Sequence, residues 1–176
     1  TFDDGPHPEI TAFVLGQLRQ YNAKATFFCI GKNVVQHAAT YANILNEGHK
    51  TGNHTFNHLN GWKADDKKYF EDIAEARKYI DSDLFRPPYG RISKLQLKYL
   101  TEAFKMKAIM WSVLSGDFDK KILPETCLKN VVLSAKSGSI IVFHDSEKAF
   151  KNLQYSLPKV LEFFREQGYR FDKINL

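Results

Sequence analysis

The sequence predicts an α/β fold on a parallel sheet, and three observations lead to this. Short apolar runs of strand type alternate with amphipathic stretches of helix type along the chain. One strand and one helix together take about 25 residues, the size of a crossover unit in parallel sheets. The 176 residues also fit a single domain, without internal repeat or low-complexity linker. Either a doubly wound open sheet or a barrel satisfies this pattern.

The first predicted elements are a strand at residues 1–2, a helix at 8–22, a strand at 25–30 and a helix at 33–47. Apolar side chains recur at three- and four-residue spacing within 8–22, which predicts a helix with one buried stripe. Residues 25–30 are compact and apolar, as in a buried strand. The next helix stops before Gly48, at a position that favours glycine.

The remaining elements continue the alternation. Residues 84–86 predict a strand that two prolines end, because a residue before proline disfavours further regular structure. Seven strands and six helices result in total. The others are a strand at 49–53, a helix at 64–80, a helix at 93–104, a strand at 106–113, a helix at 124–136, a strand at 139–144, a helix at 150–167 and a strand at 168–174.

Composition narrows the class of protein. Hydrophobic residues make up 43% and charged residues 26%, which is typical of a folded domain and not of a disordered chain. The net charge is +5 and the lysines are scattered, so we expect no nucleic-acid partner. No apolar run approaches the roughly 20 residues of a membrane span. We expect a monomer in which Cys29 and Cys127 are separate buried thiols.

Reactive side chains follow the predicted strands, at the end where parallel α/β folds place their functional loops. Asp3 and Asp4 follow the first strand, and the Gly-Pro turn after them can bring both carboxylates inward. His54 and His58 follow the third strand with the i, i+4 spacing of one helical turn, which suits two ligands of one metal. Taken singly, each group also fits a solvated turn or an ordinary structural histidine.

Three further loops place reactive side chains at the same end of the predicted sheet. Arg86 ends the fourth strand with a permanently charged fork suited to a carboxylate. Asp117 follows the fifth strand, and His144 ends the sixth. Five loops on one rim would have to collect these groups by accident, so the sequence predicts one site rather than five unrelated residues.

These residues occur in the order of the five motifs of the polysaccharide deacetylases, carbohydrate esterase family 4 (the NodB homology domain), and the chain resembles that family over its whole length. The motif TFDDGP stands at 1–6, HTFNH at 54–58 and RPPYG at 86–90. The fourth motif, usually D-x-x-D-W, reads LSGDF at 114–118, and the fifth ends in VFH at 142–144.

The resemblance implies a distorted seven-stranded (β/α) barrel with outer helices, as one domain over residues 1–176 whose first strand is truncated at Thr1. It implies a metal-dependent hydrolase that removes N-acetyl groups from an N-acetylglucosamine polysaccharide such as peptidoglycan or a chitin-like chain. An O-acetyl xylan-type esterase with the same site, or an inactive carbohydrate-binding relic, are the alternatives. The family's usual substrates indicate the cell envelope or the outside, although no export signal is visible here.

By the same resemblance, Asp4, His54 and His58 hold one divalent cation. Zinc is the expected ion, and cobalt, nickel or manganese also suit two imidazoles and a carboxylate. No G-x-S-x-G motif occurs, so a serine nucleophile is not expected.

The family pattern also assigns the catalytic groups. Asp3 is the expected base, oriented by Arg86, while His144 is the expected acid, paired with Asp117.

The backbone N–H of Tyr89 is expected at the oxyanion, and Phe118 and Val142 at the acetyl methyl. Two positions depart from the pattern: Leu114 replaces an acid and Phe118 a tryptophan. Because neither is a ligand or a proton-transfer group, we expect activity to survive.

Overall fold

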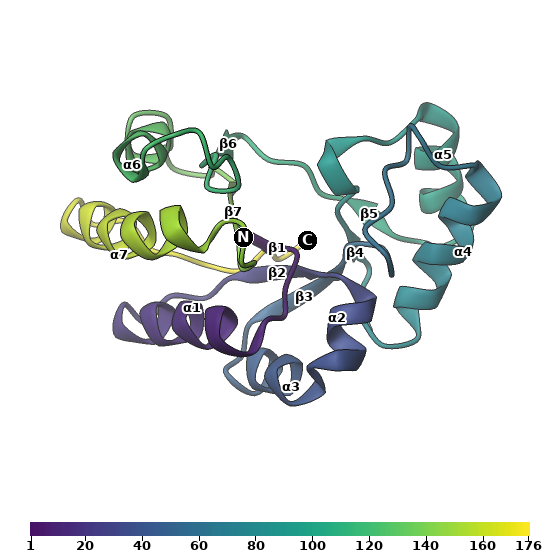
Figure 1. Ribbon diagram of the computed structural model, residues 1–176, viewed down its shortest axis with the longest axis horizontal. Helices are drawn as coiled ribbons and strands as arrows, with labels where there is room; N and C mark the ends of the chain where they lie inside the picture. The colour runs from purple at the N-terminus through teal and green to yellow at the C-terminus, as the bar shows by residue number, and fades with distance from the viewer.

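A computed structural model describes residues 1–176, and its centre is one sheet of seven parallel strands in the order β5-β4-β3-β2-β1-β7-β6. Figure 1 shows the helices arranged around the outside of these strands. This confirms the predicted distorted seven-stranded barrel. The strands are β1 (Phe2–Asp3), β2 (Thr26–Cys29), β3 (Lys50–Asn53), β4 (Leu84–Phe85), β5 (Lys107–Ala108), β6 (Val113–Leu114) and β7 (Ile141–His144).

The helices begin where the sequence supplies local signals for a start. Pro8 opens the first one, and Nδ1 of His7 accepts a hydrogen bond from the Ile10 N–H. Ser93 and Gln96 form a capping box before the fifth. The helices are α1 (Pro8–Gln20), α2 (Gly31–Gln36), α3 (Ala38–Asn46), α4 (Asp66–Arg77), α5 (Lys94–Glu102), α6 (Pro124–Val132) and α7 (Phe150–Glu166), with a 3-10 turn η1 (Pro88–Gly90).

The strand count was right, but two of the predicted strands were wrong. The run 106–113 is not one strand, because β5 and β6 lie at opposite edges of the sheet and residues 109–112 connect them. The run 168–174 is not a strand either. It meets β2 and the residues just before β2 at isolated points: the Ile174 N–H donates to the Thr26 hydroxyl, and the Phe171 carbonyl accepts from the Lys24 N–H. Alternating apolar residues allowed a strand there, but no continuous ladder forms.

The predicted helix 33–47 is two helices. Backbone angles of φ −125° and ψ 48° at His37 end α2 and turn the chain before α3 begins. The predicted stop is confirmed, because Gly48 follows α3 with a φ of 77° that glycine adopts without strain.

The core lies between the outer face of the sheet and the helices, and it fixes which side chains face inward. The ring centroid of Phe2 is 5.0 Å from that of Phe27 and 6.3 Å from that of Phe143. These phenylalanines pack into the main apolar cluster with residues of α1 and α7. Side chains alternate along a strand, so the next residues, Asp3 and His144, face the inside of the curl.

Both cysteines are buried free thiols, as predicted. No helix combines the length and apolar character that crossing a bilayer requires.

Candidate active site

The two aspartates after β1 reach the same site because the backbone leaves strand geometry between them. Asp3 pairs in register with His144 of β7, which places the ends of these strands side by side. Asp4 has a φ of 80°, outside the strand region, so its side chain does not alternate to the far face. The prediction that both carboxylates turn inward is therefore met, with the turn at Asp4 itself.

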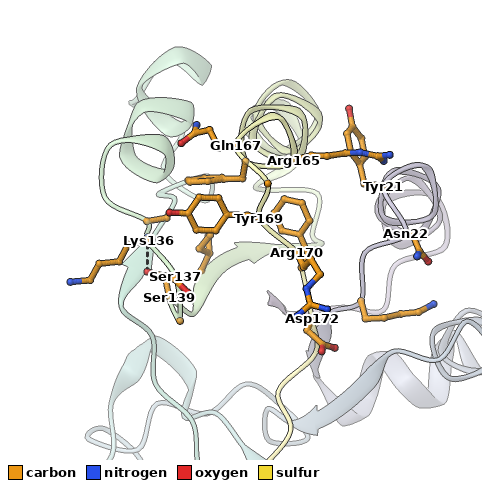
Figure 2. Close-up of a pocket in the computed structure, with 17 residues that line it drawn as sticks. Tyr21, Asn22, Lys136, Ser137, Ser139, Arg165, Gln167, Tyr169, Arg170 and Asp172 are labelled. Carbon is orange, nitrogen blue, oxygen red and sulfur yellow. Dashed lines mark hydrogen bonds between the residues drawn. The ribbon is translucent and has the colours of Figure 1, made fainter.

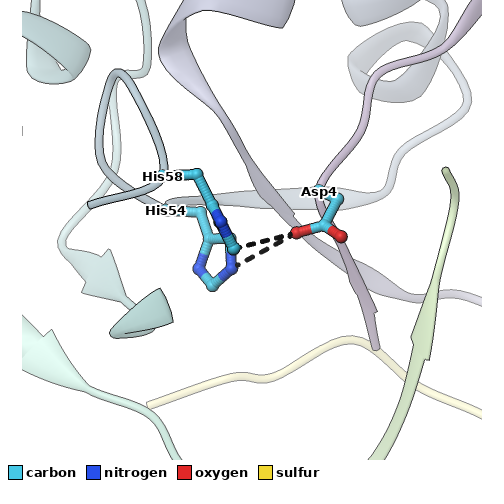
Figure 3. Close-up of side chains that lie close together, drawn as sticks. All are labelled: Asp4, His54 and His58. Carbon is cyan, nitrogen blue, oxygen red and sulfur yellow. Dashed lines mark ion pairs between the residues drawn. The ribbon is translucent and has the colours of Figure 1, made fainter. Parts of the chain in front are cut away.

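Asp4, His54 and His58 form a compact ligand set, which we call the metal half of the site (Figure 3). Their ligand atoms lie within 4.8 Å of one another. Oδ1 of Asp4 is 3.2 Å from Nε2 of His58 and 3.7 Å from Nε2 of His54. The two imidazoles do not sit on a helical turn as the spacing suggested. Positive φ angles at Thr55 (64°) and His58 (58°) shape an irregular turn instead.

The electrostatics of these three residues suit a divalent cation. Nδ1 of His54 lies 2.7 Å from the Arg86 carbonyl oxygen, so it carries the proton and leaves the Nε2 lone pair facing Asp4. Burial lowers the pKa of His54 to about 4, which keeps the imidazole neutral at physiological pH. Oδ1 of Asp4 is buried without a hydrogen-bond partner. A cation would satisfy that oxygen, so Asp4, His54 and His58 fit the divalent metal ion that the sequence predicts.

The pKa of Asp4 is held low against its burial. Burial acts to raise it, but the imidazole of His58 beside the carboxylate, with His144 and His54 nearby, holds it below the ordinary value. Asp4 is therefore ionised, as a metal ligand must be.

Arg86 is completely buried and joins two parts of the molecule. Its Nη1 donates to Oδ1 of Asp3 at 2.7 Å and to the Thr1 hydroxyl at 2.8 Å. Its Nε and Nη2 donate to the carbonyls of Ile109 and Met110, in the connection between β5 and β6. The guanidinium thus fixes the Asp3 carboxylate and satisfies backbone oxygens between the sheet edges.

Asp117 and His144 form the second half of the site, which we call the proton-transfer half. Nδ1 of His144 donates to Oδ1 of Asp117 at 2.8 Å, and the His144 backbone N–H donates to Oδ2 at 2.7 Å. Burial alone would lower the pKa of His144, but the charge and hydrogen bond of Asp117 outweigh it and raise this pKa to about 9. The imidazole is therefore protonated at neutral pH.

The three predicted substrate-contacting residues lie in different settings. Tyr89 is 62% exposed, and its ring centroid is 4.7 Å from that of His58. The Phe118 ring meets the His144 ring edge-on at 5.1 Å. Val142 is buried on β7, two residues before His144 and so on the same face of the strand.

Asp145 is a residue that the sequence reasoning missed. It is buried, its Oδ1 accepts from the Gly5 N–H at 3.1 Å and its Oδ2 from the Thr11 hydroxyl at 2.5 Å. Its own N–H donates to the Asp3 carbonyl at 3.1 Å. A carboxylate next to His144 therefore holds the loop that carries Asp3 and Asp4. The only sequence signal was an acid directly after a strand-end histidine, which also fits a solvated turn.

A large cavity lies away from these residues, beside the amino ends of β2 and β7, and Figure 2 shows its lining. It has a volume of about 1160 Å³, and its lining includes Lys24, Lys136 and Arg170. The lining contains no histidine, no cysteine and a single carboxylate, Asp172. Cavity size therefore does not locate the chemistry of this protein, whereas the cluster at the carboxyl ends of the strands does.

Comparison with known proteins gives consistent matches. The model of the polysaccharide deacetylase family matches residues 1–108. A peptidoglycan-N-acetylglucosamine deacetylase of Bacillus cereus is 39% identical over 97% of this chain and 83% of its own length. A chitooligosaccharide deacetylase of Azorhizobium caulinodans is 33% identical over 82% of this chain and 71% of its own length.

The structural comparison agrees. The crystal structure of a peptidoglycan N-acetylglucosamine deacetylase with a bound N-oxidanyl-benzamide has a TM-score of 0.92 at 33% identity, covering 98% of this chain and 83% of that one. Other relatives are longer: this chain spans 64% of a second Bacillus cereus deacetylase and 37% of one from Listeria monocytogenes.

Proposed function

The chain belongs to the polysaccharide deacetylase family of hydrolases, and from that premise we propose that it removes N-acetyl groups from an N-acetylglucosamine-containing polysaccharide, with peptidoglycan as the first candidate. The observation that carries the proposal is the pairing of a metal half with a proton-transfer half at one rim of the sheet. The names of the similar Bacillus cereus proteins support peptidoglycan as the substrate.

The metal half prepares the hydrolytic centre. Asp4, His54 and His58 would hold one divalent cation, which when bound polarises the amide carbonyl and lowers the pKa of a water molecule. Of the two neighbouring aspartates, Asp4 points at the imidazoles, while Asp3 is bound by Arg86. Asp3 is therefore the carboxylate left to accept the proton of the attacking water.

Arg86 acts on the reaction through Asp3. Its buried guanidinium holds one carboxylate oxygen at 2.7 Å, which fixes the orientation of the base and leaves the other oxygen for the water proton. Arg86 is thus a positioning residue.

The proton-transfer half handles the leaving group. The amine leaves the tetrahedral intermediate of amide hydrolysis only when its nitrogen is protonated, so the site needs an acid that still holds its proton at neutral pH. Asp117 keeps His144 in that form and binds its Nδ1, so Nε2 is free to donate to the departing nitrogen.

The surrounding residues would receive the acetyl group. Phe118 and Val142 lie beside the His144 side chain or share its face of β7, and they offer apolar surface to the methyl. The backbone N–H of Tyr89 is the proposed donor to the developing oxyanion.

The test is acetate release from N-acetylglucosamine oligomers and from peptidoglycan by the zinc-loaded protein. We expect release that a chelator stops and added zinc restores. Asp3→Asn should lower the rate by roughly 100- to 10,000-fold, the usual contribution of a general base. A folded, metal-holding protein that releases no acetate from either glycan would refute the proposal, and O-acetylated xylan would then be assayed.

A further inference from the structure

The exposed pair Trp62 and Arg91 stands beside the proposed active site and has no role in the chemistry described so far. The Trp62 side chain is 61% exposed, and Cζ of Arg91 lies 4.2 Å from the centroid of its ring. The exposed indole ring and the guanidinium beside it together form a stacked aromatic and cationic surface. The Arg91 side chain is exposed and makes no ion pair and no hydrogen bond within the protein.

A buried side chain holds the two residues in place. Nε2 of Gln96 donates to the Gly61 carbonyl at 2.7 Å, next to Trp62, while Oε1 of Gln96 accepts from the Ser93 N–H at 2.9 Å. Gly61 lies so close to the Arg91 backbone that a Cβ atom there would be 2.5 Å from the Arg91 carbonyl oxygen. The two loops are therefore packed together, and the pair is presented on a fixed support.

Both residues adjoin the metal half through the chain. Trp62 follows the ligand His58 by four residues, and Arg91 follows Tyr89, whose ring lies against His58, by two. A polysaccharide bound at the metal half must place its next sugar on the surface around the site, and this pair is an exposed, fixed part of it.

The chemistry of the pair indicates what that sugar carries. The flat face of an indole stacks on the apolar C–H face of a pyranose, and the guanidinium covers only one of the two indole faces. The guanidinium of Arg91 has no hydrogen-bond acceptor within the protein, so its N–H groups can bind a carboxylate through two parallel hydrogen bonds. Exposed Lys63 and Lys94 lie beside the pair and add positive charge. The carboxylates of Asp65 and Asp66 are turned to the Lys67 N–H and the Gln96 amide within the protein.

Resting on the proposed function, we infer that Trp62 and Arg91 form a sugar subsite that favours a carboxylate-bearing ring next to the N-acetyl group under attack. The N-acetylmuramic acid of peptidoglycan carries such a group on its lactyl substituent wherever the stem peptide has been removed. A neutral N-acetylglucosamine polymer would stack on Trp62 and leave Arg91 unused.

The test compares three soluble substrates with the zinc-loaded protein: a peptide-free tetramer of alternating N-acetylglucosamine and N-acetylmuramic acid, the same tetramer with its lactyl carboxylates converted to amides, and the N-acetylglucosamine tetramer. We expect a preference in kcat/KM for the acidic tetramer over its amide, and Arg91→Ala should reduce that ratio about tenfold through KM. Trp62→Ala should raise KM for all three substrates, and Trp62→Phe should restore most of the loss.

Arg170→Ala is the matched control, because Arg170 is an exposed arginine at the opposite end of the sheet. An acid-to-amide ratio that Arg91→Ala leaves at the wild-type value, or that Arg170→Ala changes equally, would overturn the subsite. Should the wild-type protein release no acetate at all, the proposed function fails. Calorimetric binding of the acidic and amide tetramers to wild type and Arg91→Ala then still decides the subsite.

Discussion

The two halves of the site use histidine in opposite ways. In the metal half, burial lowers the pKa of His54 to about 4, and Oδ1 of Asp4 beside it has no hydrogen-bond partner. In the proton-transfer half, Asp117 raises the pKa of His144 to about 9 and both of its carboxylate oxygens are satisfied. The buried oxygen of the metal half needs a cation as its partner, whereas the carboxylate of the proton-transfer half finds its partners within the protein. Neighbouring carboxylates and burial, not residue type, decide which histidine is neutral, as a metal ligand must be, and which is protonated, as a proton donor must be.

The largest effect should come from breaking the metal half. His58→Ala removes a ligand and leaves Asp4 and His54 too few donors to hold zinc tightly, so acetate release should fall to the background rate. Zinc content by atomic absorption, with circular dichroism to check folding, would test this. A variant that retains zinc and turnover would show that the ligand set is wrong.

Asp117→Asn should have the next largest effect, and it changes the pH profile. His144 acts in its protonated form, so activity falls as pH rises through its pKa. Without the Asp117 charge this pKa should drop from about 9 toward 6.5, and the alkaline limb of kcat should move to lower pH. At pH 8 the protonated fraction of His144 then falls about 30-fold, and we expect the rate to fall by about that factor. An alkaline limb that stays in place would separate Asp117 from His144.

Gly5→Ala sharpens the comparison, because it strikes the loop of Asp4 directly and reaches His144 only through the neighbouring Asp145. A Cβ at residue 5 would lie 2.1 Å from Oδ2 of Asp145, so the loop that carries Asp4 must shift. We expect zinc affinity to fall about 10- to 100-fold, as when outer-shell partners of a ligand are lost. The pKa of His144, followed by NMR in the zinc-loaded protein, serves as the comparison: Asp117 still contacts His144 in this variant, so that pKa should fall much less than in Asp117→Asn.

The smallest expected effect concerns stability. Burial raises the pKa of Asp145 from 3.8 to about 7, so between these values the folded protein binds a proton that the unfolded chain has released. The contribution of this group to the free energy of unfolding therefore falls as pH rises from about 4 to 7. Asp145→Asn removes the titration. Urea unfolding of both proteins from pH 4 to 8 should show the wild type losing stability relative to the variant; a constant difference would contradict it.

Much of the fold was predictable because its signals are local. Pro8, Gly48 and the Ser93 capping box mark helix ends, and the uninterrupted apolar run of β2 marks a strand buried on both faces. The break between β5 and β6 was not predictable from the sequence, because it depends on which strands form the two edges of the sheet. The segment 168–174 alternates like a strand, and only its lack of a paired neighbour shows that it is not one.

The site was predictable in its members but less so in its geometry. Spacing placed His54 and His58 together, yet positive φ angles and not a helical turn bring their rings to 5.0 Å. Asp145 escaped notice because its role depends on complete burial against Gly5 and Thr11, which lie more than 130 residues away in the chain. Contacts of that range leave no periodic signal in a sequence.

The hydrogen bonds of Arg86 link the orientation of the Asp3 carboxylate to local opening of the connection between β5 and β6. The guanidinium that holds Asp3 also holds the carbonyls of Ile109 and Met110, where β5 ends and the chain crosses to β6. Edge segments of this kind open more often than central strands. Each such opening frees Nε and Nη2 of Arg86, so the guanidinium orients Asp3, the proposed base, less firmly. Amide hydrogen exchange at residues 109–113 therefore reports how often this happens. A mutation at this distant edge can therefore lower turnover while the protein remains globally folded.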